Sequence, residues 1–150
     1  SSLASIPDGT IEKALLHVKD NGIIAGVNIA EKIIENSKHP IIGNPIKIGN
    51  IFVAQYNFPE FMNWNDAKVA CTKLGNGWRL PNKNELNTMY INRDKIGGFS
   101  DDFYWSSTEP SRGIVWQQYF YNGFQSLENI RYGLASDSPP TLYVRAVRTI

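Results

Sequence analysis

Apolar residues recur at helical spacing before Pro45, whereas residues 46–56, directly after it, are rich in β-branched and aromatic residues, so the predicted structural type changes at this point. Residues 10–20 place an apolar residue every three or four positions, as one face of a helix does. A second helix is predicted over residues 28–36, ending before His39-Pro40, because the residue that precedes a proline rarely stays helical. Residues 1–45 are therefore predicted to form a helical lead segment for oligomerisation or attachment.

Two turn signals divide the β-rich part of the chain. Gly49-Asn50 interrupts a run of β-branched and aromatic residues at 46–56, which predicts a tight hairpin. Asn122-Gly123 predicts a second hairpin with a two-residue turn, because both residue types tolerate positive φ. Further strands are predicted over residues 114–120, 124–127 and 142–150, the last of which closes the sheet.

Two helices are predicted between these hairpins, each with a signal at its start. Asn63 can cap a helix whose first turn contains Asp66 and whose end is marked by Gly75. Asn82 and Glu85 have the spacing of a capping box. The predicted buried residues are Ala67, Ala70, Cys71 and Leu74 in the first helix and Leu86, Met89 and Tyr90 in the second.

The order of these elements favours an α+β fold over an alternating parallel sheet. Helices are followed by strands, and the last strand is predicted to return near the first. A chain of 150 residues is long enough for a domain with its own core, predicted here over residues 46–150.

Charge and composition argue against several classes of partner. Fifteen basic and fourteen acidic residues give a formal charge of +1, so no long-range field attracts nucleic acid or an anionic membrane. No apolar run approaches the roughly 20 residues of a membrane span. The single Cys71 cannot form a disulfide within the chain.

The residue types of common active sites do not come together in the sequence. No Gly-x-Ser-x-Gly motif surrounds the serines, and both histidines, His17 and His39, lie in the lead segment. Cys71 is expected to be a small buried hydrophobe in its helix. Asp101-Asp102 with Glu109 could bind calcium, but solvated loop charge is the preferred interpretation. The sequence therefore predicts no catalytic residue, no metal and no cofactor.

Two motifs are interpreted as architectural. Trp78-Arg79-Leu80-Pro81 supplies a large ring and a guanidinium that can hold several acceptors in fixed geometry. Glu85 is either the partner of Arg79 or the acceptor for its own helix start. Tyr104-Trp105-Ser106-Ser107-Thr108 is predicted to be a core strand whose hydroxyls hydrogen-bond to neighbouring backbone.

The candidate ligand-binding surface is the predicted hairpin over residues 115–131. Alternate residues of a strand project to opposite sides, so Trp116, Gln118 and Phe120 share one face and the residues between them share the other. One face can therefore anchor the hairpin while the other binds a ligand through aromatic rings and amides. The alternative is an ordinary half-exposed strand. The predicted ligand-binding residues are Gln117, Tyr119, Tyr121, Asn122, Phe124, Ser126, Glu128, Asn129, Arg131 and Tyr132.

Three strings occur in a fixed order: Gly77-Trp78-Arg79-Leu80-Pro81 with Glu85-Leu86, then Tyr104-Trp105-Ser106-Ser107-Thr108, then Val144-Arg145-Ala146-Val147-Arg148. Together they resemble the C-terminal domain of bacterial collagen-like adhesins, the Lcl C-terminal domain family. That family also occurs in phage and surface proteins, including targets of diversity-generating retroelements. The resemblance covers residues 46–150 and implies a C-type-lectin-like fold, in which a small twisted antiparallel core displays a loop-rich face to ligands.

The resemblance also assigns roles within the hairpin. Diversified members keep a constant scaffold and vary the positions between, but the usual run of asparagines is missing here, so diversification of this chain stays an open question. Glu109-Pro110-Ser111 departs from the glutamate-proline-asparagine signature of calcium-dependent lectins, which argues against calcium-dependent sugar binding. The scaffold matches are Trp116, Gln118, Phe120, Gly123 and Gln125, and the variable matches are Gln117, Tyr119, Tyr121, Asn122, Phe124, Ser126, Glu128 and Asn129.

Two functional hypotheses follow, from different classes. The first is a non-enzymatic binding module of an extracellular, cell-surface or virion protein, which presents the hairpin and residues 109–112 to a glycan or protein receptor. The second is a structural virion protein, a decoration protein or tail-fibre tip, that acts by self-association through its lead segment. Members of the resembled family are often trimeric, which implies a homo-oligomer. An enzyme is the least favoured hypothesis.

Overall fold

The computed structural model describes residues 39–131 and 138–150. The chain divides into two units, Ser1–Gly43 and Asn44–Ile150, and the second contains every helix and strand described below. The helices predicted at 10–20 and 28–36 lie outside the described residues, and the domain boundary predicted after residue 45 stays a prediction.

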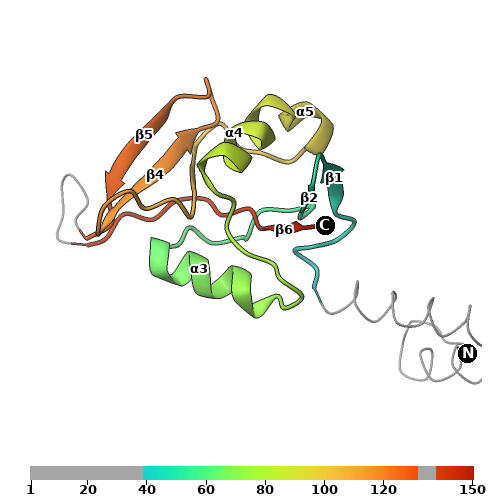
Figure 1. Ribbon diagram of the computed structural model, residues 1–150, viewed down its shortest axis with the longest axis horizontal. Coiled ribbons are helices and arrows are strands. Elements are labelled where there is room, and N and C mark those ends of the chain that lie inside the picture. The colour runs from blue at the N-terminus through green and yellow to red at the C-terminus, as the bar shows by residue number, and fades with distance from the viewer. Residues whose placement is uncertain (1–38, 132–137) are drawn as a thin grey trace, which may run out of the picture. The chain divides into compact units, whose positions relative to one another are not determined.

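The second unit has two antiparallel sheets of three strands each. The strands are β1 (Ile46–Ile48), β2 (Ile51–Val53), β3 (Phe103–Trp105), β4 (Ile114–Tyr119), β5 (Gln125–Asn129) and β6 (Val147–Thr149). One sheet has the order β1-β2-β6 and the other the order β3-β4-β5. In Figure 1 the β4–β5 hairpin lies at the left, and β1, β2 and β6 lie to the right. The last strand therefore pairs with a strand of the first hairpin, in agreement with the prediction that it returns near the first strand.

Three helices accompany the sheets: α3 (Trp64–Lys73), α4 (Lys83–Ile91) and α5 (Arg93–Ile96). The Asn63 side chain accepts a hydrogen bond from the Asp66 N–H, and Asn82 and Glu85 form both bonds of a capping box. Figure 1 shows α4 beside the β4–β5 hairpin, α5 next to it toward β1 and β2, and α3 at the bottom of the view. The predicted α+β class and both predicted helix starts are confirmed.

The first hairpin has the predicted two-residue turn. Ile48 lies opposite Ile51, which leaves Gly49 and Asn50 as the turn, and Gly49 takes a φ of +58°. A glycine at this first position allows a turn whose twist matches that of the strands.

The second hairpin turns more widely than predicted. The last register pair is Gln118 with Gln125, and beyond it the Tyr119 N–H donates to the Phe124 carbonyl at 2.8 Å. Four residues, 120–123, therefore form the turn, and Gly123 takes positive φ (+86°) whereas Asn122 does not. The prediction of a two-residue turn was therefore wrong. The physical reason is that the wider turn allows Phe120 to be buried in the core.

The closing strand is shorter than predicted. β6 begins only at Val147, and residues 142–146 instead connect the two sheets. Leu142 pairs with Met62 on one side, and Tyr143 pairs with Tyr104 of β3 on the other. Because this segment pairs with two different parts of the chain, it does not form one continuous ladder of strand hydrogen bonds.

One hydrophobic cluster joins both sheets to α4 and α5. Its aromatic centre is a set of edge and tilted contacts around Phe120, whose ring centroid lies 4.5 Å from that of Tyr104 and 5.5 Å from that of Tyr90. The buried members are Ile48, Ile51, Val53, Leu86, Met89, Ile96, Tyr104, Phe120 and Val147.

Candidate ligand-binding site

One face of the β4–β5 hairpin is tied to α4 by side-chain amides. The fully buried Gln118 donates from Nε2 to the Asn87 Oδ1 at 2.9 Å and to the Gly123 carbonyl at 3.0 Å. Gln125 donates from its own Nε2 to Gln118 Oε1 at 3.2 Å and to the Lys83 carbonyl at 3.0 Å. These bonds fix the position of the turn relative to the helix.

Ring contacts strengthen the same anchor. Lys83 Nζ lies 3.6 Å from the centroid of the Trp116 ring, a distance at which a cation is attracted to the ring face. Gly123 packs so closely on α4 that a Cβ there would lie 2.5 Å from Tyr90 Cε2. The residues that match the resembled family's constant scaffold therefore hold the hairpin against the core.

The opposite face of the sheet carries the candidate binding residues. Directly opposed residues of antiparallel strands share a face, so the register assigns members to it from all three strands. We call this surface the hairpin face, and its members are Phe103, Trp105, Val115, Gln117, Tyr119, Ser126 and Glu128.

Aromatic rings dominate the hairpin face toward the turn. The Phe103 and Tyr119 rings stack with centroids 4.5 Å apart and planes 19° apart, and the Tyr121 centroid lies 5.9 Å from that of Tyr119. Tyr121 is 66% exposed and Phe124, across from Tyr119, is 63% exposed. The turn thus presents rings to solvent while its backbone is fixed from behind.

The hairpin face becomes buried toward its other end. Trp105 is fully buried and donates from Nε1 to the Met62 carbonyl at 2.7 Å. Beside it, Gln117 is only 8% exposed, and its Nε2 donates to Ser126 Oγ at 3.1 Å. The Gln117 Oε1 is buried and has no hydrogen-bond partner in the described part of the chain.

Not all of the predicted ligand-binding residues come together. Gln117, Tyr119, Ser126 and Glu128 share the hairpin face. Asn129 pairs with Ile114 and so lies on the side of Trp116, toward α4. The remaining predicted residues surround the ends of the hairpin: Tyr121, Asn122 and Phe124 are in or beside the turn, Arg131 follows β5, and Tyr132 lies outside the described residues.

Two features of this surface were not predicted from the sequence. Gln117 was predicted to be a ligand-binding residue, but it is buried on the central strand of its sheet, with Trp105 and Ser126 directly opposite it on the two neighbouring strands. Phe103 was not among the predicted residues, although its ring stacks on Tyr119. Its place next to the Tyr104-Trp105 motif is the only signal that could have pointed to it.

The loop at residues 109–112 does not lie near the turn. The Glu109 Oε2 accepts a hydrogen bond from the Gly113 N–H at 2.8 Å, immediately before β4 begins at Ile114. Six strand residues, or roughly 20 Å, separate this loop from the turn. A ligand that contacts both must therefore be extended along the hairpin.

The Trp78-Arg79-Leu80-Pro81 junction has the predicted structural role. Arg79 forms two bonds to the Glu85 carboxylate, at 2.7 and 2.9 Å, while Glu85 Oε1 also accepts the Asn82 N–H at 2.9 Å. Glu85 therefore fills both of the roles considered for it. The hydrogen bond to Arg79 lowers the pKa of Glu85 and raises that of Arg79.

The other two motifs are also held by internal contacts. Ser106 Oγ donates to the Trp116 carbonyl at 2.6 Å, and Thr108 Oγ1 accepts the Lys83 N–H at 2.8 Å. In the closing motif, the buried Arg145 guanidinium donates to Asn57 Oδ1 at 2.8 Å and lies over the Phe99 ring. Burial lowers the pKa of Arg145 to about 10, so the side chain stays protonated at neutral pH.

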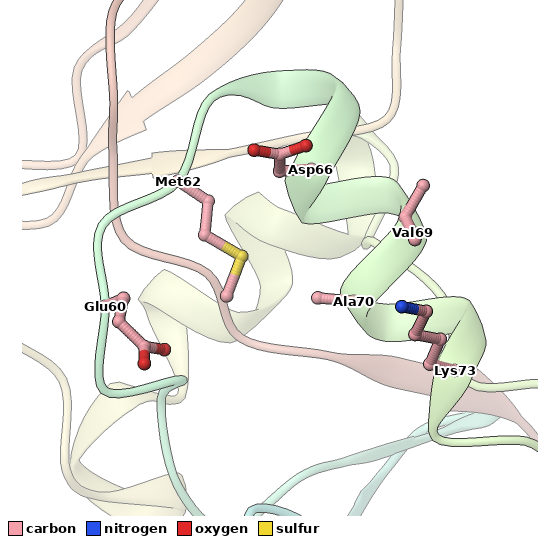
Figure 2. A pocket seen from close by; sticks show the side chains of 6 residues that line it. All are labelled: Glu60, Met62, Asp66, Val69, Ala70 and Lys73. Carbon is pink, nitrogen blue, oxygen red and sulfur yellow. The ribbon is translucent and has the colours of Figure 1, made fainter.

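A shallow cavity of about 330 Å³ lies on α3, apart from the predicted ligand-binding residues. Figure 2 shows the Met62 side chain reaching from the preceding segment toward the helix, with the carboxylates of Glu60 and Asp66 at the rim. Val69 and Ala70 complete the apolar part of the lining, and Lys73 adds a cation.

Groups for metal or thiol chemistry are sparse in the described ranges. No three His, Cys, Asp or Glu side chains within residues 39–131 and 138–150 are grouped as a metal site would require. Cys71 is fully buried, and burial raises the pKa of its thiol to about 12. Among the helices that the structure describes, none has the length and apolarity to cross a membrane.

No protein-family model matches the chain, and no curated protein does. Among solved structures, the chain is similar to botrocetin, with 12% sequence identity and a TM-score of 0.48 over 71% of this chain and 97% of that one. It is also similar to a chain in the complex of a mutant von Willebrand factor A1 domain with botrocetin, with 12% identity, a TM-score of 0.47 and the same two coverages. Membership of the Lcl C-terminal domain family therefore stays a prediction from the three sequence strings.

Proposed function

We propose that the chain contains a non-enzymatic binding module that presents the hairpin face and the turn at residues 120–123 to a receptor. The observation that supports this function is the division of one hairpin into an anchored face and an exposed aromatic turn. Side-chain amides and a lysine cation fix the anchored face. The rings of Tyr121 and Phe124, which belong to the aromatic turn, are exposed to solvent.

This division suits binding for two physical reasons. Large exposed rings cost solubility and are favourable when a partner covers them, so their clustering marks an interaction surface. A backbone that is already fixed loses little conformational entropy when the partner arrives. The amides of Gln118 and Gln125 provide that fixation here.

The finer assignment combines the fold with the three sequence strings. We assign the second unit to a C-type-lectin-like fold of the Lcl type, in an extracellular, cell-surface or virion protein. The architectural contacts of Arg79, Ser106 and Arg145 support this assignment, because they give each of the three strings a structural reason to be present. The hairpin is then the segment that retroelement-diversified relatives vary.

A matched pair of variants tests the binding function. Tyr121→Ala combined with Phe124→Ala should reduce receptor binding at least about tenfold, because the rings are the exposed apolar contacts of the turn. The melting temperature should change little, since both side chains are mostly exposed. Binding is measured on an array of glycans and on candidate receptor proteins, with thermal unfolding followed in parallel.

Tyr56→Ala is the control, because Tyr56 is another exposed aromatic residue (51%) that lies outside the hairpin. It should leave binding unchanged. Equal loss of binding in the control, or loss of folding together with binding in the double variant, would contradict the proposal.

The assembly alternative depends on residues 1–45, most of which lie outside the described residues. It proposes that apolar surface of the lead segment joins copies of the chain, as in a trimeric decoration protein or fibre tip. Light scattering on the full chain and on a fragment of residues 44–150 tests it.

A further inference from the structure

We infer that two copies of the chain pair antiparallel through the outer edge of β5, with Leu127 of each copy facing Leu127 of the other across a two-fold axis. The pairing joins the β3-β4-β5 sheets of both copies into one continuous sheet. This interface goes beyond the proposed function, because it uses the edge of the hairpin rather than its face. It also differs from the assembly alternative, which depends on the lead segment.

The first argument is that β5 has the open edge among the described strands. The outer side of β3 is bridged by Tyr143, and that of β6 is bridged by Arg79. β1 has only three residues, with the exposed Lys47 at its centre, and short length and lysine both protect an edge from pairing. β5 has five residues, no lysine and no proline, and its register with β4 contains no bulge.

The second argument is the direction of the backbone groups of β5. The Tyr119 N–H donates to the Phe124 carbonyl, and the Ile130 N–H donates to the Gly113 carbonyl. Because bonding alternates along an antiparallel strand, the even-numbered residues of this segment bond to β4 and the odd-numbered ones direct their N–H and C=O groups away from it. The outward residues are Gln125, Leu127 and Asn129.

The third argument is that the centre of β5 is apolar and matches itself. Leu127 is the middle residue of the strand, and its side chain is 48% exposed. With Leu127 on the axis, its N–H and C=O bond to those of its counterpart, and Gln125 lies opposite Asn129 of the second copy. All outward backbone groups of the strand then have partners, and the two leucine side chains cover each other.

The polar side chains are complementary in the same register. Ser126 lies opposite Glu128 of the second copy, so the only charged residue of β5 meets no like charge. Ser126 Oγ already accepts the Gln117 Nε2, which leaves its hydroxyl hydrogen to donate to that carboxylate. Glu128 Oε1 now accepts the Asn129 N–H at 3.0 Å, and this N–H is released to bond across the interface when Glu128 accepts from Ser126 instead.

Pairing within one sheet also keeps the same face of both copies on the same side. Two hairpin faces are therefore presented together, and a partner with repeated binding sites can engage both at once.

The experiment places charge on the axis of the full chain. Leu127→Lys and Leu127→Glu each set two like charges opposite one another, so each should weaken dimerisation about tenfold or more. A mixture of the two variants sets opposite charges there and should restore a dimer with one copy of each. Sedimentation equilibrium measures the masses and dissociation constants, and ion exchange separates the mixed dimer. Val69→Lys is the control, because Val69 is equally exposed (51%) but lies on α3, and it should leave dimerisation unchanged.

The parent itself should dimerise, or form an even-numbered assembly, with a dissociation constant below about 1 mM. A parent that is monomeric at that concentration, a trimer, or an assembly of the same mass in both Leu127 variants would overturn the inference. A mixture that forms no mixed dimer would overturn it as well, because residue 127 would then not face its counterpart. Unfolding of either variant, followed by circular dichroism, would also count against it by giving Leu127 a role within one copy.

Discussion

At the scale of single residues, the half-buried Glu85 and the buried Arg145 are held by different kinds of partner. Glu85 receives two donors, the Arg79 guanidinium and the Asn82 N–H, and so joins the junction after α3 to the start of α4. Arg145 has no carboxylate partner in the described part of the chain, and its guanidinium is held by Asn57 Oδ1 and by the carbonyls of Ala54 and Gly97. Arg145 therefore connects segments far apart in sequence, whereas Glu85 joins residues that are close neighbours along the chain.

Glu85→Gln tests the charged part of the first arrangement. Gln keeps an oxygen for the helix cap but loses the charged pair with Arg79, so we expect the free energy of unfolding to fall by about 1–2 kcal/mol at pH 7. Because the folded-state pKa of Glu85 is lowered, its contribution is full above the unfolded value and is lost as pH falls through the folded-state pKa.

The difference between parent and variant should therefore be constant near neutral pH and vanish in acid. Urea unfolding at a series of pH values measures it. Glu60→Gln is the control, because Glu60 is exposed at the rim of the α3 cavity and its replacement should matter little. A difference that persists in strong acid would show that the charge is not its cause.

At the scale of elements, the close approach of the hairpin turn to α4 decides its shape. Gly123 and Gly97 have nearly the same φ, +86° and +85°, but only Gly123 has a neighbour within 4 Å of its missing Cβ, the Tyr90 ring. Comparing substitutions at the two glycines therefore separates the effect of backbone strain from that of steric contact with Tyr90.

Gly123→Ala should therefore be more destabilising than Gly97→Ala. We expect a loss of about 1 kcal/mol for Gly97→Ala from its positive φ alone, and about 2–4 kcal/mol for Gly123→Ala, where Tyr90 must also move. Thermal or denaturant unfolding measures both. Equal losses would mean that the hairpin can shift away from α4 at little cost.

At the scale of the whole molecule, the second unit contains a complete hydrophobic cluster. Its buried members run from Ile48 to Val147, and all belong to the unit Asn44–Ile150. The closing segment contributes at both of its ends, through the bridge from Leu142 to Met62 and through β6.

A fragment of residues 44–150 should therefore unfold in one cooperative transition, with a melting temperature within a few degrees of that of the full chain. A fragment of residues 44–141 is the control and should not fold, because it lacks β6 and the segment between the sheets. Circular dichroism during heating distinguishes them, and a non-cooperative 44–150 fragment would contradict the prediction.

Light scattering on the same samples decides between the two functional hypotheses. If the full chain is oligomeric and the 44–150 fragment is monomeric, self-association requires residues 1–43 and the assembly alternative gains weight. Monomers in both samples would contradict it.

Features that depend on near neighbours in sequence were predictable. Asn63 with Asp66 and Asn82 with Glu85 are each three residues apart, and both caps formed where predicted. The turn at Gly49-Asn50 needed only a residue that adopts positive φ. In each case the energy that selects the structure comes from atoms within one turn of chain, so the sequence alone was sufficient.

Features that depend on distant neighbours were decided by tertiary structure. The Asn122-Gly123 turn is wider than its sequence predicts, because Phe120 enters a core made with Tyr90 and Tyr104. Gln117 is buried because β3 and β5 flank β4, which no local pattern reveals. Sequence therefore determined where α3, α4 and the first turn lie, while packing between remote segments determined which side chains of the hairpin remain available to a ligand.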